Sequence, residues 1–270
     1  MNLSEITLPS KKYKRKATVF SIAIFVVAIA CFYMGFNPFG FFTEFHFVRD
    51  LLGEMFPPNF NALWSSSSVG YSFLQTMSMA FLGTLYGSLI AIVIAFLAAT
   101  NTMPLKTVRM CAKFSLSLLR VVPALVVVLI FVIAVGIGSF AGVLTLVVIT
   151  IGTFGKLFTE IIENTEVPPS EAIFSVGASQ VQVIRYSVIP QILPSFIANL
   201  LYAFDVNVRA AIGLGIFGGG GIGFELYLSM RVLHYKDAMA YIFFIIVLVI
   251  LVEKISNYLR MRLLNEGSLK

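Results

Sequence analysis

Charged side chains are scarce in this chain of 270 residues, because Asp, Glu, Lys and Arg together supply only 12% of it. A soluble domain carries about 25% charged residues. The hydrophobic share is 59% and the mean hydropathy is +0.94. So few charges cannot cover a surface that faces water. The composition therefore excludes a soluble globular domain and indicates a polytopic membrane protein.

The residues that build disulfides, metal sites and nucleophilic centres are also rare. The two cysteines, Cys31 and Cys111, do not suggest a disulfide framework. The two histidines, His46 and His234, are far apart and have no metal-ligand spacing. The sequence contains no G-x4-G-K-[ST] nucleotide motif and no convincing catalytic triad. We therefore expect no catalytic residue, no metal and no cofactor in this chain, and no ATPase activity of its own.

Long apolar runs are what the chain has instead. Six of them are long enough to cross a bilayer as helices, which takes about 20 residues. The first has no small-residue cleavage site and is predicted to be a retained span rather than a signal peptide. The sequence thus predicts an all-α polytopic membrane protein with six transmembrane helices. The runs lie at about 17–36, 72–99, 115–137, 140–160, 192–214 and 238–258.

The distribution of positive charge predicts the orientation. If the N-terminus is cytoplasmic, the inside segments hold fourteen of the 19 Lys and Arg residues, and the outside segments hold three. This asymmetry follows the positive-inside rule and points to lipid headgroups, not nucleic acid, as the partner of the excess charge. Both termini are then cytoplasmic. The predicted parts are a basic N-terminus (1–16), a first helix (17–36), an external segment (37–71), a five-helix core (72–258) and a cytoplasmic C-terminus (259–270).

The external segment 37–71 contains "FPPNF" at 56–60, followed by Trp64. Aromatic residues of this kind favour the interface between lipid and water. Two interpretations stay open, an amphipathic helix lying in the interface and a plain linker with aromatic anchors.

The longest cytoplasmic connection, 156–191, carries the sharpest local pattern. Pro168 and the proline after it end any helix that leaves the fourth span. Ser170 then predicts a helix N-cap, and Ala172, Val176 and Ser179 fall at helical spacing on one face. Gly177 allows a sharp change of direction. A second short helix, from Gln180 to Ser187 and ending before Pro190, would complete a knob that fits a groove on another protein.

This connection is similar to a known motif. The pattern E-A-x4-G-x11-I-P resembles the "EAA" loop of ABC-transporter permeases, which docks into a cleft on a cytoplasmic ATPase subunit. Ser187 departs from it, because an aliphatic residue is common there. The resemblance implies an ATPase-coupling role for Glu171, Ala172, Gly177, Ile189 and Pro190.

A wider likeness covers most of the chain after about residue 50. The segments 135–146, 155–166 and 202–223 resemble the permease subunit of phosphonate ABC importers, as does "MFPPNF" at 55–60. Asp205 stands where that family is expected to have Glu. The resemblance implies a fold like that of type I ABC importer permeases, in the inner membrane of a bacterium. It also implies a second copy of the chain, two ATPase subunits and an external substrate-binding protein.

The stretch "IGLGIFGGGGIG" at 212–223 contains G-x-G-x-x-G, the spacing of a dinucleotide-binding loop. That site needs a preceding strand within a parallel sheet, whereas an apolar helical run precedes the glycines here. The sequence instead favours a broken or re-entrant segment that lines the translocation pathway near its external mouth. Close helix packing is the alternative. The predicted pathway residues here are Gly218, Gly219, Gly220 and Gly221.

Two charges interrupt the fifth span just before these glycines. Asp205 and Arg209 are four residues apart and so share a helix face, whereas Asn207 lies on another. A charge inside a membrane costs at least ~2.5–3.5 kcal/mol, so such residues often mark a pathway. We assign all three to the translocation pathway, and a purely structural ion pair is the alternative. Arg120 is predicted to be a snorkelling anchor at the cytoplasmic start of the third span.

The sequence thus predicts the permease subunit of an ATP-driven importer for phosphonate or a related small phosphorus oxyanion. An ion-coupled secondary transporter or channel for a small anion is the alternative, and a membrane scaffold without transport is a third possibility. Which solute crosses is not fixed by any of these patterns.

Overall fold

The computed structural model describes residues 11–37, 40, 44–65 and 67–267. Every regular element in these ranges is a helix, which confirms the predicted all-α fold. The chain divides into two compact units, Met1–Phe56 and Pro57–Lys270. Residues 1–10 of the predicted N-terminal segment, and the last three of the C-terminal one, lie outside the described ranges.

The first unit holds two helices. α1 (Lys11–Tyr33) is apolar enough to span a membrane from Arg15 onward, as the first apolar run predicts. α3 (Phe45–Met55) is amphipathic, with His46, Arg49 and Asp50 among its aromatic and aliphatic residues. It ends at Phe56, so the "FPPNF" stretch itself is a non-helical connection. The interfacial helix within 37–71 stays a prediction, and the Trp64 side chain is outside the described part.

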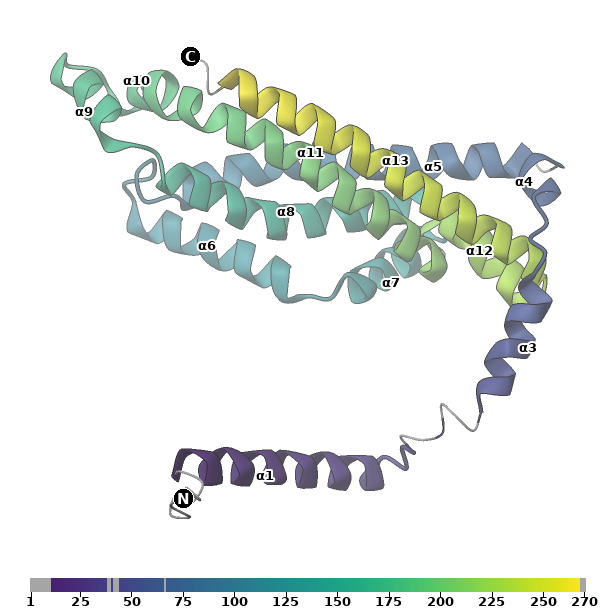
Figure 1. Ribbon diagram of the computed structural model, residues 1–270. Helices are drawn as coiled ribbons and strands as arrows, with labels where there is room; N and C mark the ends of the chain where they lie inside the picture. The colour runs from purple at the N-terminus through teal and green to yellow at the C-terminus, as the bar shows by residue number, and fades with distance from the viewer. Residues whose placement is uncertain (1–10, 38–39, 41–43, 66, 268–270) are drawn as a thin grey trace, which may run out of the picture. The chain divides into compact units, whose positions relative to one another are not determined.

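The second unit is a bundle in which α11 and α13 lie side by side (Figure 1). Among the described residues of the whole chain, five helices are long and apolar enough to cross a membrane, or six if one bent pair counts as a single span. The helices of this unit are α4 (Asn61–Ser65), α5 (Ser67–Ala98), α6 (Lys106–Val121), α7 (Ala124–Val135), α8 (Ser139–Glu163), α9 (Val167–Ser175), α10 (Gln180–Val183), α11 (Ile189–Leu214), α12 (Ile222–Arg231) and α13 (Tyr235–Gly267).

The bent pair is α6 and α7, which meet at an angle of 88°. Val122 is extended because it precedes a proline, and Pro123 has no N–H with which to continue the helix. The third apolar run, 115–137, is therefore not the single helix that its hydropathy predicts. α6 packs along α8, where Lys113 already pairs with Glu163, and the bent pair that could form the third span begins at Lys106.

Small residues hold the centre of the bundle together. α5 and α8 are the most closely associated pair of helices. A Cβ on Gly83 would overlap Leu146, and one on Gly87 would lie 2.5 Å from Cβ of Thr150. Close approach of two backbones is the main source of helix association in lipid, where no hydrophobic effect drives it. The pairs advance by four residues on both helices, so α5 and α8 run parallel.

Candidate functional site

The segment that joins α8 to α11 begins with a short helix whose start the sequence misplaces. α9 starts at Val167 and its N-cap is Glu166, so Ser170 is an internal residue and not the cap. Pro168 is placed in the first turn, where the missing N–H of a proline has no helical partner to lose. The prolines therefore separate α9 from α8, as predicted, but they begin the new helix instead of preceding it.

A tight turn then leads into the second short helix. Gly177 has φ +84°, a left-handed conformation that favours glycine. The helical spacing predicts that Val176 and Ser179 extend the face of α9. They do not, because α9 ends at Ser175. Ser179 instead caps α10 in a reciprocal box with Gln182.

The predicted break before Pro190 is absent. α10 continues through a π-helical turn, η1 (Ile184–Val188), directly into α11. The wider turn lies at the position where the ring of Pro190 would otherwise clash with the carbonyl four residues earlier. The short helix and the fifth span are one continuous rod, so a displacement of α10 is transmitted to α11.

A chain of hydrogen bonds ties α9 to the same rod. The Glu166 amide donates to Oε1 of Gln191 at 2.9 Å, and Nε2 of Gln191 donates to Oγ of Ser187 at 3.0 Å. The Ser187 hydroxyl, which is buried, also lies 2.9 Å from Oγ of Ser170. An aliphatic side chain at 187 could not make these bonds. The departure of Ser187 from the motif therefore has a local structural role.

Polar contacts also fix the segment to the loop between α5 and α6. Nδ2 of Asn101 donates to the Ile162 carbonyl at 2.6 Å, and Nε2 of Gln180 donates to the Thr102 carbonyl at 3.1 Å. At the end of α8, Oε1 of Glu163 accepts from the Thr100 amide and pairs with Nζ of Lys113, both at 2.9 Å. The segment between α8 and α11 is thus bonded both to α11 and to the loop between α5 and α6.

α9 itself has no buried residue, although much of it is apolar. Phe174 on α9 is 51% exposed, and Val176, in the turn that follows, is 83% exposed. An exposed apolar patch of this kind is typical of a surface that binds another protein. The five residues that carry the motif are all exposed, namely Glu171, Ala172, Gly177, Ile189 and Pro190.

The charges of the fifth span form a small network. Arg209 pairs with Oδ2 of Asp205, as the spacing predicts, and its Nη1 lies 3.6 Å from Oε2 of Glu253 on α13. Asp205 is 6% exposed, and its Oδ1 has no hydrogen-bond partner among the described residues. The Arg209 side chain is 42% exposed. The arginine therefore presents part of its guanidinium at the surface of the subunit while it neutralises a buried carboxylate.

Asn207 faces the opposite way, into the bundle. It is 2% exposed, and its amide donates to Oγ1 of Thr84 at 2.8 Å and to Oγ1 of Thr150 at 2.9 Å. This contact joins α5, α8 and α11 in the interior. The structure thus gives Asn207 a packing contact, and no surface at which it could meet a solute.

The exposed side of α11 carries a row of polar or small residues. Tyr202, Arg209 and Gly213 are exposed, and Asn199 is half-buried. Spacings of three, seven and four residues place them on one helix face. No Cβ contact would form at Gly213 with the described residues. We call this row, from Asn199 to Gly213, the α11 face.

The glycine run breaks the helix, as predicted. α11 passes through a second π-helical turn, η2 (Gly215–Gly219), in which Phe217 and Gly218 leave helical geometry, and α12 then begins at Ile222. Gly220 and Gly221 both have positive φ. No strand precedes them among the described residues, so the glycines do not form a dinucleotide-binding loop of the kind that follows a strand.

The same glycines are buried, so packing is part of their role. A Cβ on Gly223 would overlap the Ile212 carbonyl, and one on Gly220 would lie 3.1 Å from the Ser139 amide. The N-terminus of α12 is closed by side chains of α5, since Oγ1 of Thr76 accepts from the Ile222 amide at 2.9 Å. The assignment of Gly218, Gly219, Gly220 and Gly221 to the pathway stays a prediction.

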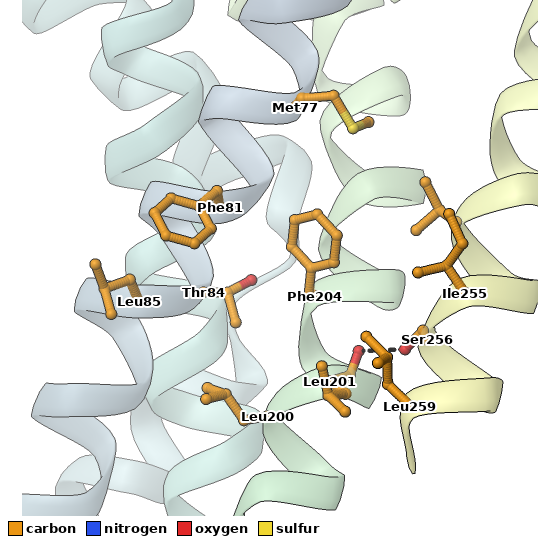
Figure 2. A pocket seen from close by; sticks show the side chains of 11 residues that line it. Met77, Phe81, Thr84, Leu85, Leu200, Leu201, Phe204, Ile255, Ser256 and Leu259 are labelled. Atoms are coloured by element: carbon orange, nitrogen blue, oxygen red, sulfur yellow. Dashed lines mark hydrogen bonds between the residues drawn. The ribbon is translucent and has the colours of Figure 1, made fainter. Parts of the chain in front are cut away.

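An apolar cleft of about 430 Å³ lies between α5, α11 and α13. Figure 2 shows Phe81 and Phe204 turned toward its centre, with the Ser256 hydroxyl bonded to the Leu201 carbonyl. Thr84 is the other polar residue of the lining. A cleft with no charged group in its lining offers an anion no compensation, so we do not place a solute there.

Several residues of these sites could not be found by pattern alone. Glu163, Gln191 and Glu253 act through partners that are tens of residues away in sequence, and the first two resemble ordinary polar residues at helix ends. One signal was available: a carboxylate at 253 within the sixth apolar run needs a cation, and Arg209 is among the few charged residues of the spans.

Residues 91–264 match the family described as the binding-protein-dependent transport system inner membrane component. The chain belongs to this family. It is thus a multi-pass permease of the inner membrane, as its apolar helices also indicate.

Individual relatives of this permease agree with that result. The phosphite transport system permease protein PtxC of Stutzerimonas stutzeri is 36% identical over 241 residues, 89% of this chain and 86% of the relative. The phosphate-import permease protein PhnE of Mycolicibacterium smegmatis is 36% identical over 215 residues, 80% of this chain but 40% of that longer protein. A solved amino acid ABC transporter superposes with a TM-score of 0.63 at 19% identity, over 76% of this chain and 98% of that one. The permease fold is therefore that of ABC importers.

Proposed function

We propose that this permease imports a small phosphorus oxyanion such as phosphite, phosphate or a phosphonate, with energy from a separate ATPase. The relatives named above carry phosphite and phosphate. Such an anion needs a positively charged, donor-rich path through the membrane. Arg209 on the α11 face provides one positive group at mid-span, where a charge without a function would be costly.

The observation that carries this proposal is the attachment of α9 to α11. The exposed apolar side of α9 is the docking surface for a cytoplasmic ATPase subunit. Docking moves α9, and the Ser187 bonds and the continuous rod transmit that movement to the α11 face. Glu171, Ala172 and Gly177 make the contact, and Ile189 and Pro190 lie where the rod enters the membrane.

The assembly that follows has two permease copies with the pathway between them, two ATPase subunits and an external substrate-binding protein. Both termini of the permease are cytoplasmic. ATP-driven closure of the ATPase pair opens the pathway toward the loaded binding protein, and hydrolysis resets it. This is alternating access around a fixed path, with no covalent chemistry in the permease itself.

Reconstitution with its ATPase and binding protein tests the solute class. Vesicles that contain the complete complex should take up radiolabelled phosphite, phosphate or methylphosphonate, and unlabelled members of the same group should compete. An equal excess of sulfate or methionine should not compete. Uptake of an amino acid in preference to all three phosphorus compounds would overturn this proposal.

The hydrogen-bond chain predicts a specific coupling defect. Ser187→Val removes the hydroxyl that joins Ser170 to Gln191, at a cost of about 1 kcal/mol for each bond lost. We expect ATPase activity to persist while the number of anions imported per ATP falls several-fold. Ser175→Ala is the matched control, because Oγ of Ser175 bonds only to the Glu171 carbonyl of its own helix. If the Ser187 variant imports as many anions per ATP as the native complex, these hydrogen bonds do not couple ATP hydrolysis to transport.

A further inference from the structure

Arg120 of α6 lies beside α8. A Cβ on Gly152 would be 2.9 Å from the backbone nitrogen of Arg120, so the two residues are directly opposite each other. Gly152 is at the middle of α8, about 16 Å from the end at Glu163 at 1.5 Å per residue. The anchor at the cytoplasmic start of the third span stays a prediction. Along the bundle, Arg120 lies level with the middle of α8.

α6 exposes two different faces along its length. One is apolar and carries Met110, Phe114, Leu118 and Val121, all more than half exposed. This face suits lipid. The other carries polar residues at spacings of four and three. We call it the α6 polar face and define it by Lys113, Ser117 and Arg120.

α8 exposes a matching row beside it. Thr153, Lys156 and Glu160 are its exposed residues in the corresponding half of the helix. A groove of about 220 Å³ runs between the two rows. Its polar lining consists of Lys113, Ser117, Lys156, Thr159, Glu160 and Glu163.

The groove occupies the last two turns of α8, and Arg120 lies about one turn above it, opposite Gly152. Charged residues inside a membrane face a water-filled cavity or another protein group. The α11 face packs against the buried side of the same helix, because the ring of Phe154 packs edge-on against Tyr202 with 6.3 Å between the ring centroids. α8 thus contacts both the groove and the α11 face.

The positive charges along this route differ in whether a carboxylate pairs with them. Nζ of Lys113 is 2.9 Å from Glu163 and Nζ of Lys156 is 3.7 Å from Glu160, so both lysines are already neutralised. Arg120 is exposed and has no ion pair or hydrogen bond within the described part of the chain. A pore must bind an ion well enough to admit it and weakly enough to release it. An unpaired arginine followed by paired lysines fits that requirement for an anion that moves from Arg120 toward the cytoplasm.

We propose that the groove between α6 and α8 is the cytoplasmic exit of the anion path, and that Arg120, opposite Gly152 and about one helix turn above Lys156, receives the phosphorus oxyanion before it enters the groove. This rests on the proposed function for the identity of the anion and for the direction of travel. Arg209 then acts higher on the path and Arg120 lower, with water between them. An anion that leaves Arg120 reaches lysines held by carboxylates and is released to the cytoplasm.

Thiol labelling of the full complex in liposomes tests the path without reference to the solute. In a background of Cys31→Ser and Cys111→Ser, Ser117→Cys places a thiol on the α6 polar face. An anionic methanethiosulfonate reagent should modify it about tenfold faster than the cationic analogue. Adding Arg120→Gln should bring the two rates together, whereas Arg120→Lys should preserve the difference. Phe114→Cys, on the apolar face at similar depth, is the control and should react with neither reagent.

Uptake of inorganic phosphite or phosphate provides the second arm. Arg120→Gln should lower it about tenfold, with the ATPase stimulation by binding protein retained, and Arg120→Lys should keep most of it. If the unmodified complex imports neither anion, the proposed solute is wrong. The labelling rates still test whether the groove is an anion path. If uptake is normal in the Arg120→Gln variant and Ser117→Cys shows no preference for the anionic reagent, the proposed exit path is overturned.

Discussion

Arg209→Gln should abolish import and weaken the assembled complex. The substitution removes the cation that neutralises Asp205, which is 6% exposed and has one oxygen already without a partner. Breaking a fully buried ion pair by removing one partner costs about 3–5 kcal/mol, and the partial exposure of Arg209 places this pair below that range. Folding should therefore suffer, which the yield of complex and its thermal midpoint in detergent will measure.

The double variant Asp205→Asn with Arg209→Gln separates structure from transport. Without either charge, no uncompensated carboxylate remains and the thermal midpoint should recover. If Arg209 also attracts the anion, uptake should stay at least about tenfold below that of the native complex. Full recovery of uptake would show that the arginine is only a structural partner of Asp205 and Glu253.

Gly177→Trp should uncouple the permease from its ATPase. The glycine has φ +84°, where an L-residue costs about 1–2 kcal/mol. No described atom lies within 4 Å of a Cβ at this position, so the subunit itself has room for the ring. The bulk would therefore act on the docked partner. We expect loss of both uptake and the stimulation of ATPase activity by the binding protein.

Two further variants separate backbone strain from obstruction. Gly177→Ala has the strain without the bulk and should retain more uptake than the tryptophan variant. Gly70→Trp adds the same ring on α5, at a glycine with no neighbouring Cβ contact and no positive φ, and should be nearly silent. If Gly177→Trp preserves both uptake and ATPase stimulation, the α9 turn is not the coupling site.

The sequence predicted the parts of this fold that depend on local chemistry. Apolar runs located the spans, the spacing of Asp205 and Arg209 gave their pairing, and the glycine run gave the break after α11. Each of these follows from residues within one helix turn or one uninterrupted stretch.

What it missed depends on how helices meet. Hydropathy cannot show that Lys113 of α6 pairs with Glu163 of α8 before the apolar run begins, or that Arg120 lies opposite the middle of α8. The continuity through Pro190 depends on a π-helical turn that no propensity reveals. The motif departure at Ser187 was visible, but its meaning needed Gln191 and Ser170 beside it.

The source of energy tests the account most directly. The permease should be purified and sealed into vesicles alone, and in parallel with its ATPase and binding protein. Phosphite, phosphate or methylphosphonate should accumulate only in the second preparation, and only with ATP. Accumulation by the permease alone under an imposed ion gradient would contradict the account and would favour a gradient-driven carrier.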